Sequence, residues 1–216
     1  MADRFNIPIV VFMFKRTKVV HIIDQIAKVK PTKLYLLGDG PRSESERNDI
    51  EDCRRQAESH ITWDCEVIKN YAVENRGVYQ NIAGGAKWVF EREKMAIFLE
   101  DDNLPSLSFF PYCQELLEKY EHDTRVLWVC GTNYMQQYTP EDGSDYVFTQ
   151  HMLPCGWASW ADKFNKYYHI MHIICFILII LTLKQIKVMR KLLLSTIALL
   201  FSVAMLAVGA GDGTSK

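Results

Sequence analysis

The sequence lacks a large excess of charge of either sign, a metal-binding spacing of cysteine or histidine, and a secretory signal at its start. Its 25 Lys and Arg residues nearly balance its 26 Asp and Glu residues, which leaves a formal net charge of −1. This balance gives no support for nucleic-acid binding through bulk electrostatics, so no nucleic-acid partner is expected. The six cysteines form no CxxC pair, and several lie inside apolar patterns, which predicts buried thiols in a reducing compartment. The six histidines form no H-E-x-x-H motif, so none is assigned as a metal ligand.

The segment Met1–Phe5 has no apolar core of the kind that a signal peptide contains. We therefore expect a cytoplasmic location for the globular part. A length of 216 residues allows one domain with an appendage. The composition changes at about Tyr168: residues 1–168 mix charged and apolar side chains, whereas residues 169–216 are mostly apolar.

Residues 169–216 contain two apolar runs, Ile170–Leu183 and Leu192–Ala210, with four basic residues between them. The second run is just long enough for a membrane span, which needs about 20 apolar residues. One interpretation is a membrane anchor, with the basic residues held on the cytoplasmic side. A second is a pair of apolar helices packed on the domain. A third is a segment foreign to the domain, because the basic, apolar and small-residue regions from Met189 to Ala210 are typical of a secretory signal peptide.

Short apolar segments predict the strands of one sheet. They are Ile7–Phe14, Lys33–Leu37, Cys65–Ile68, Met95–Leu99 and Val126–Cys130. The near-continuous apolar run of the first is typical of a strand covered on both faces. Because these segments alternate with helical patterns, the sequence predicts an α/β fold with a mostly parallel sheet and helices on both faces.

Apolar residues at helical spacing lie between the predicted strands. They form four faces: Val19, Ile22, Ile23, Ile26 and Ala27; Ile50, Cys53 and Ala57; Ile82, Ala86, Val89 and Phe90; and Phe109, Phe110, Cys113, Leu116, Leu117 and Tyr120. Thr17 is placed to cap the first helix. Ser43 and Glu46 have the spacing of a capping box for the second.

Three carboxylates follow the predicted strand Met95–Leu99, at Glu100, Asp101 and Asp102. In an open α/β sheet, ligands bind at the carboxyl ends of the strands. Adjacent carboxylates repel one another unless a cation neutralises them, and Mn²⁺ or Mg²⁺ suits such oxygen ligands, with substrate phosphates completing the shell. The alternative is a solvated acidic turn before a helix that begins near Pro105.

The pattern of residues 5–168 resembles the GT-A fold of nucleotide-sugar glycosyltransferases, in particular the GlcNAc-transferases of early N-glycan processing and their bacterial relatives. The resemblance is carried by the order and spacing of several motifs. These are Pro8–Phe12 with Arg16, Leu37–Gly40, Trp88–Phe90, Ala96–Asp102 and Leu153–Trp160. It implies a metal-dependent, inverting transfer of sugar from a nucleotide-diphosphate donor, with a UDP-sugar favoured, to a glycan or another hydroxyl acceptor.

The resemblance also implies roles for single residues. Asp102 would ligate Mn²⁺ (or Mg²⁺), and the metal would bridge the donor diphosphate. Asp101 would lie near the ribose and Glu100 near the transferred sugar. Arg16 would face the nucleotide or its phosphates, and Asp39 would recognise the base. Gly156 and Trp157 would help to form the wall of the donor-sugar or acceptor pocket.

Physical chemistry gives some of these roles an independent reason. Cleavage of a sugar–phosphate bond builds negative charge on the departing diphosphate, which a metal and Arg16 would stabilise. An aromatic wall suits a sugar ring and excludes water. Simpler interpretations remain for three positions: Arg16 as a surface charge at a helix start, Asp39 as a turn residue, and Trp157 with Trp160 as helix core.

The match fails downstream of Trp160, where the family carries a catalytic carboxylate that accepts the acceptor's proton. Asp162 and Asp212 are the acidic residues in that part of the chain, and neither has the matching position, so the catalytic base is unassigned. This gap motivates a rival hypothesis, a membrane-tethered pseudoenzyme or scaffold that binds nucleotide sugar without turnover. A third is a nucleotidyltransferase, although Phe14–Thr17 lacks the glycines that a phosphate loop of that class usually has.

Overall fold

The computed structural model describes residues 5–132, 140–150, 153, 155–166 and 168. These residues belong to the first of two compact units of the chain, Met1–Tyr168. Residues 169–216, for which a membrane anchor, a helical pair and a foreign segment were considered, lie outside the described residues. In the described part of the chain, no helix has both the length and the apolar character needed to cross a membrane.

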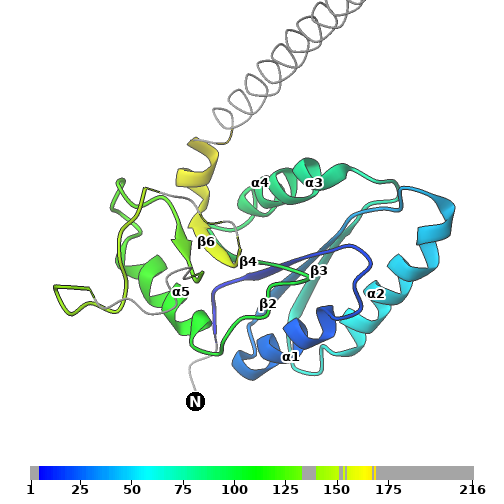
Figure 1. The fold of residues 1–216 in the computed structure, drawn as a ribbon, viewed down its shortest axis with the longest axis horizontal. Coiled ribbons are helices and arrows are strands. Elements are labelled where there is room, and N and C mark those ends of the chain that lie inside the picture. Colours follow the sequence, from blue (N-terminus) through cyan, green and yellow to red (C-terminus); the bar gives the residue numbers. More distant parts are fainter. Residues whose placement is uncertain (1–4, 133–139, 151–152, 154, 167, 169–216) are drawn as a thin grey trace, which may run out of the picture. The chain divides into compact units, whose positions relative to one another are not determined.

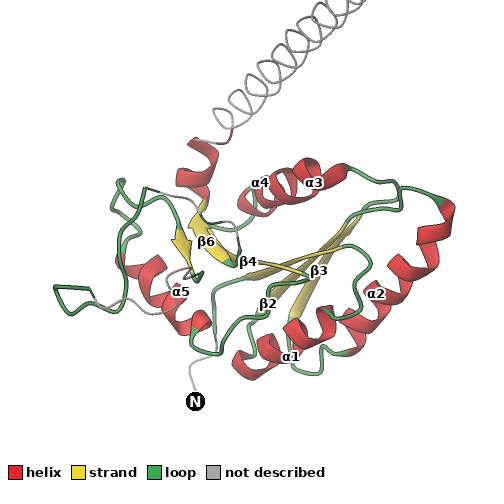
Figure 2. Ribbon diagram, viewed as in Figure 1, coloured by secondary structure: helices red, strands yellow, loops and turns green. Residues whose placement is uncertain are grey.

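Strands and helices alternate along the chain (Figure 2). The strands are β1 (Ile9–Met13), β2 (Lys33–Gly38), β3 (Glu66–Tyr71), β4 (Met95–Glu100), β5 (Val129–Cys130) and β6 (Trp157–Trp160). The helices are α1 (Val19–Val29), α2 (Arg47–Ser59), α3 (Gly77–Tyr79), α4 (Gly85–Phe90) and α5 (Phe109–Lys119), with a 3₁₀ turn η1 (Glu44–Glu46) and a π-helical turn η2 (Gln80–Gly84). The predicted mixed α/β class is confirmed.

The sheet has the order β3-β2-β1-β4-β6-β5. Strands β3, β2, β1 and β4 run parallel, while β6 pairs antiparallel with both β4 and β5. The chain therefore builds outward from β1 to β3 and then returns to place β4 on the other side of β1. At this reversal the carboxyl ends of β1 and β4 lie side by side, the position at which open α/β sheets bind ligands.

Both faces of the sheet are covered by apolar side chains, as the strand pattern predicts. One cluster packs α1, α2 and α5 against β1, β2 and β4, and it includes Ile23, Cys53 and Phe110. The other packs α4 against the opposite face through Ala86, Val89 and Phe90. Figure 1 shows α1 and α2 on one side of the sheet and α3 with α4 on the other.

The predicted caps are wrong. Lys18 occupies the N-cap of α1 without a side-chain hydrogen bond, and Thr17 contributes only its backbone carbonyl, which accepts from the Val20 N–H. Ser43 precedes η1 with no side-chain capping bond. Glu46 instead turns its carboxylate toward Lys15 and Arg42, where it accepts charge-assisted hydrogen bonds from two cations in place of one backbone N–H.

Two further expectations change in the last part of the sheet. The strand predicted over Val126–Cys130 is reduced to Val129–Cys130. Trp157 and Trp160 lie in β6 and not in a helix. Successive residues of a strand point to opposite faces, so two residues three apart do as well. Trp157 therefore joins the cluster beneath α4 and Trp160 joins the cluster beneath α5. A spacing of three would place both rings on one face of a helix, which is why the sequence pattern misleads.

Candidate functional site

The carboxyl ends of β1 and β4 bring Arg16 and the acidic triplet together. Arg16 Nη1 lies 2.6 Å from Asp101 Oδ1 and 2.9 Å from Asp102 Oδ2. The two strands are direct neighbours, with Phe12 opposite Glu100 in the register. Residues that are 85 positions apart in the sequence thus form one polar cluster at the point where the strand order reverses.

The neighbouring carboxylates Asp101 and Asp102 have different environments. The side chain of Asp101 is only 6% exposed and accepts a hydrogen bond from the Phe14 N–H in addition to the Arg16 contact. The side chain of Asp102 is 53% exposed and also accepts from the Asn103 amide. Asp101 therefore fixes the loop after β1 to the end of β4, while Asp102 presents its carboxylate to solvent.

Glu100 carries the electrostatic cost of this arrangement. Burial raises the pKa of its carboxyl, and the negative charges of Asp102 and Asp101 raise it further. The positive charge of Arg16 opposes this shift. In return, the hydrogen bond and charge of Asp101 raise the pKa of Arg16, as does the charge of Asp102. Arg16 thus compensates only part of the negative charge of the three carboxylates, which favours the binding of a further cation at this edge.

A divalent cation at this edge would have to be held mainly by its substrate. Among the described residues, no group of three His, Cys, Asp or Glu side chains is placed to hold a metal ion. Asp102 offers an exposed carboxylate, which suits Mg²⁺ or Mn²⁺ because these ions commonly take one or two protein carboxylates and complete their shell with phosphate oxygens and water. Metal binding at Asp102 stays a prediction.

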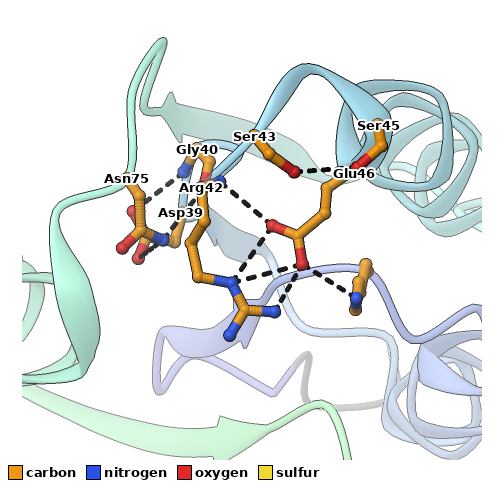
Figure 3. A network of polar contacts seen from close by, with 8 residues as sticks. Asp39, Gly40, Arg42, Ser43, Ser45, Glu46 and Asn75 are labelled. Atoms are coloured by element: carbon orange, nitrogen blue, oxygen red, sulfur yellow. Dashed lines mark hydrogen bonds and ion pairs between the residues drawn. The ribbon is translucent and has the colours of Figure 1, made fainter.

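Two more cations lie at the end of β1, and the sequence analysis missed both. Lys15 and Arg42 share the carboxylate of Glu46: Lys15 Nζ lies 2.9 Å from Oε1, and the Arg42 backbone N–H and guanidinium donate to both oxygens (Figure 3). The Arg42 guanidinium also lies over the Phe14 ring, 5.1 Å from its centroid. The run Lys15-Arg16 at a strand end could have identified Lys15, and Arg42 follows the end of β2; both lie where open α/β sheets bind ligands.

Asp39 lies at the same edge of the sheet, since its N–H donates to the Met13 carbonyl at the end of β1. Its buried carboxylate, however, is occupied by the chain itself. Oδ1 accepts from the N–H groups of Gly40 and Arg76, and Oδ2 accepts from the Gly77 N–H and the Asn75 amide; the contacts to Gly40 and Asn75 are visible in Figure 3. This geometry favours the turn-shaping interpretation of Asp39, and base recognition stays a prediction.

A pocket of about 220 Å³ lies beside the acidic turn. It is lined by Leu99, Asn103, Leu104, Pro105, Ser106, Phe109, Gly131, Thr132, Cys155 and Gly156. The side-chain oxygen of Asn103 accepts from both the Glu100 N–H and the Gly156 N–H, which joins the acidic turn to the segment before β6. Gly156 adopts φ +65°, a conformation that favours glycine. The structure thus places Gly156 in the wall of a pocket next to Asp102.

Trp157 does not belong to the lining of this pocket, and it packs in the cluster on the α4 face of the sheet. Its ring stacks between Phe98, at 4.0 Å between centroids, and Trp128, at 3.8 Å. With 4% of the residue exposed, both ring faces are covered by protein. In this geometry Trp157 is a core residue, and its contact with a sugar stays a prediction. Asp162, beyond β6, is exposed and has no observed role as a catalytic base.

Comparisons with known proteins do not assign this chain to a family. No protein-family model matches it, and no curated protein matches it. Among solved structures, it is similar to a 4-diphosphocytidyl-2C-methyl-D-erythritol synthase from Anaerococcus prevotii, with 11% sequence identity, a TM-score of 0.46 and 77% of each chain covered. A likeness at this level carries no conclusion about function, which has to come from the site.

Proposed function

We propose that this protein is a metal-dependent glycosyltransferase that moves a sugar, with inversion, from a nucleotide-diphosphate donor to an acceptor hydroxyl. A UDP-sugar is the favoured donor. The observation that carries the proposal is the contact of Arg16 with Asp101 and Asp102 where the strand order reverses. This is the position at which an open α/β sheet binds nucleotides.

The charges at this edge suit a diphosphate. Arg16, Lys15 and Arg42 gather at the end of β1, where each can approach phosphate oxygens. Asp102 would hold the Mn²⁺ or Mg²⁺ ion that neutralises the diphosphate when donor is bound. When the sugar–phosphate bond breaks, negative charge grows on the leaving nucleoside diphosphate, and preorganised cations stabilise it. Asp101 contributes by holding Arg16 and the backbone of Phe14 in place.

The pocket beside the acidic turn would receive the donor sugar or the acceptor. Its lining includes Asn103, the residue after Asp102, together with Gly131, Thr132 and Gly156. The apolar side chains of Leu99, Leu104 and Phe109 lie in the same lining. Such a surface can pack against the apolar face of a sugar and exclude the water that would hydrolyse the donor.

Binding tests the proposal first. The full chain is titrated with UDP and with GDP, by calorimetry, in Mn²⁺ and in EDTA. We expect UDP affinity to rise at least tenfold with Mn²⁺, which corresponds to about 1.4 kcal/mol. Asp102→Asn should abolish the metal-dependent gain, whereas Glu115→Gln, at an exposed position of α5, should leave it unchanged. The proposal is overturned if the chain binds neither UDP nor GDP, or if its affinity for them does not change with Mn²⁺.

Product analysis then separates the three candidate functions. A glycosyltransferase releases UDP from a UDP-sugar in the presence of an acceptor. A nucleotidyltransferase, the alternative, would join UTP to a sugar phosphate and release pyrophosphate from the UTP. The observation in favour of this alternative is the presence of the basic residues Lys15 and Arg42 near Arg16. Metal-dependent binding of UDP-sugar without release of either product would identify the scaffold.

A further inference from the structure

A second pocket, of about 160 Å³, lies at the carboxyl ends of β2 and β3 beside the start of α2. It is lined by Pro41, Arg47, Ile50, Glu51, Arg54, Tyr71, Ala72 and Val73. None of these residues belongs to the acidic triplet or lines the pocket at Gly156. The space equals several water molecules at about 30 Å³ each, enough for one phosphate or carboxylate group with a short substituent.

The guanidinium of Arg54 has no carboxylate partner at this pocket. Its Nη2 donates to the carbonyls of Asp39 and Ala72, each at 3.0 Å, and its Cζ atom lies over the Tyr71 ring, 4.6 Å from the ring centroid. Nε is buried without a hydrogen-bond partner. Within the described ranges, Arg54 takes part in no ion pair and Nη1 has no hydrogen-bond acceptor. Charges held away from water are normally paired, and this half-buried cation has no carboxylate partner among the described residues.

The surrounding charges offset part of the cost of burial. Burial lowers the pKa of Arg54, whereas the neighbouring Tyr71 and Glu51 raise it, and the charge of Arg76 lowers it by less than either. Arg47 supplies a second cation in the pocket lining, although it also pairs with Glu44 through two contacts of 2.7 and 2.9 Å. Glu51 is the acidic residue of the lining, and it is exposed. Its carboxylate lies in the pocket lining without forming an ion pair with Arg54 in the structure.

We propose that this pocket binds a small oxyanion, a phosphate ester or a carboxylate, through the Arg54 guanidinium and Arg47, separately from the nucleotide site. Nη2 ties the ends of β2 and β3 together and so holds the guanidinium in one orientation. Because the cation is fixed before the ligand arrives, an anion that reaches Nη1 gains a charge-assisted hydrogen bond without ordering a flexible side chain. Glu51 competes with the anion for the same positive charge.

To test this, the full chain is titrated with inorganic phosphate, glucose 6-phosphate and succinate, each at constant ionic strength. The chain carries Arg16→Ala, which weakens anion binding at the proposed nucleotide site. Binding is followed by NMR at the Ile50 methyl and the Ala72 amide. We expect saturable shifts at both positions. Glu51→Gln should tighten binding threefold to tenfold, and Arg47→Gln should weaken it by a similar factor. Both residues are at least partly exposed, and these variants leave Arg54 itself unchanged.

Lys28→Gln, on the exposed surface of α1, is the matched control for a loss of one positive charge and should leave the affinity unchanged. A phosphate ester ligand is indicated if glucose 6-phosphate binds best, and a carboxylate ligand if succinate does. The proposal is overturned if no anion shifts Ile50 and Ala72. It is also overturned if Glu51→Gln and Arg47→Gln change affinity no more than Lys28→Gln does. These outcomes are independent of whether the chain binds UDP.

Discussion

Arg16 Nη1 donates to Asp101 Oδ1 across 2.6 Å and joins the ends of two neighbouring strands. The same nitrogen lies 2.9 Å from Asp102 Oδ2. One cation thus holds two consecutive carboxylates whose environments differ, since Asp101 is buried and Asp102 is exposed. This contact fixes the geometry on which the proposed donor site depends.

Arg16→Ala should reduce the affinity for UDP at least tenfold, because the site loses a cation that faces the phosphates. The free energy of unfolding should fall by no more than about 1 kcal/mol, since the Arg16 side chain is 58% exposed and its ion pairs are screened by solvent. Calorimetric titration and urea unfolding measure the two effects. Lys28→Ala is the control. Wild-type affinity in the Arg16 variant would contradict the assignment.

Asp39→Asn should lower the free energy of unfolding by about 2–4 kcal/mol. The side-chain amide cannot accept at its nitrogen, so two of the four donors around Asp39 lose their acceptor. Amide hydrogen exchange should accelerate at Arg76 and Gly77, and urea unfolding gives the stability. Asp24→Asn, in an exposed pair with His60, is the matched control. A stable Asp39 variant with altered preference among nucleotide bases would instead support base recognition.

Glu100→Gln should stabilise the fold at neutral pH. Because the pKa of Glu100 is raised in the folded state, the folded chain binds more protons at this site than the unfolded chain does. The destabilising effect of the ionised Glu100 carboxylate on the wild type is absent below the pKa of the unfolded chain, about 4.3, and is complete above the pKa of the folded chain. The difference in urea midpoint between the variant and the wild type should therefore grow as the pH rises from about 4 to 7. A pH-independent difference would exclude this cause.

Gly85→Ala and Gly84→Ala should have opposite effects, although both glycines have helical backbone angles. A methyl group at Gly85 would lie 2.7 Å from Leu37 Cδ2 and 3.0 Å from Phe12 Cε1, which costs about 1–3 kcal/mol by overpacking. At Gly84 it would meet only the end of the Gln80 side chain, at 3.1 Å. There the helix propensity of alanine should add up to about 1 kcal/mol. Thermal unfolding measures both, and equal destabilisation would refute the close approach of α4 to the sheet.

The sequence predicted the elements that local pattern controls. The apolar runs at Ile7–Phe14 and Met95–Leu99 correspond to β1 and β4, and the helical stripe at Ile22 and Ile26 is buried on α1. The acidic triplet at a strand end was also visible, because its position relative to an apolar run is a property of the chain itself. The caps were not predicted correctly, and neither were the short last strands, whose pairing partners lie far away in sequence.

By itself, the sequence determined an α/β chain whose strands end in polar residues, because burial imposes an apolar period that can be read locally. Tertiary structure decided what those residues do. It directed Arg16 to Asp101 and Asp102, used the carboxylate of Asp39 to hold its own neighbouring loop, and stacked Trp157 between Phe98 and Trp128 in the core. A charged or aromatic side chain acquires its role from the groups that surround it, and strand order and register choose those groups.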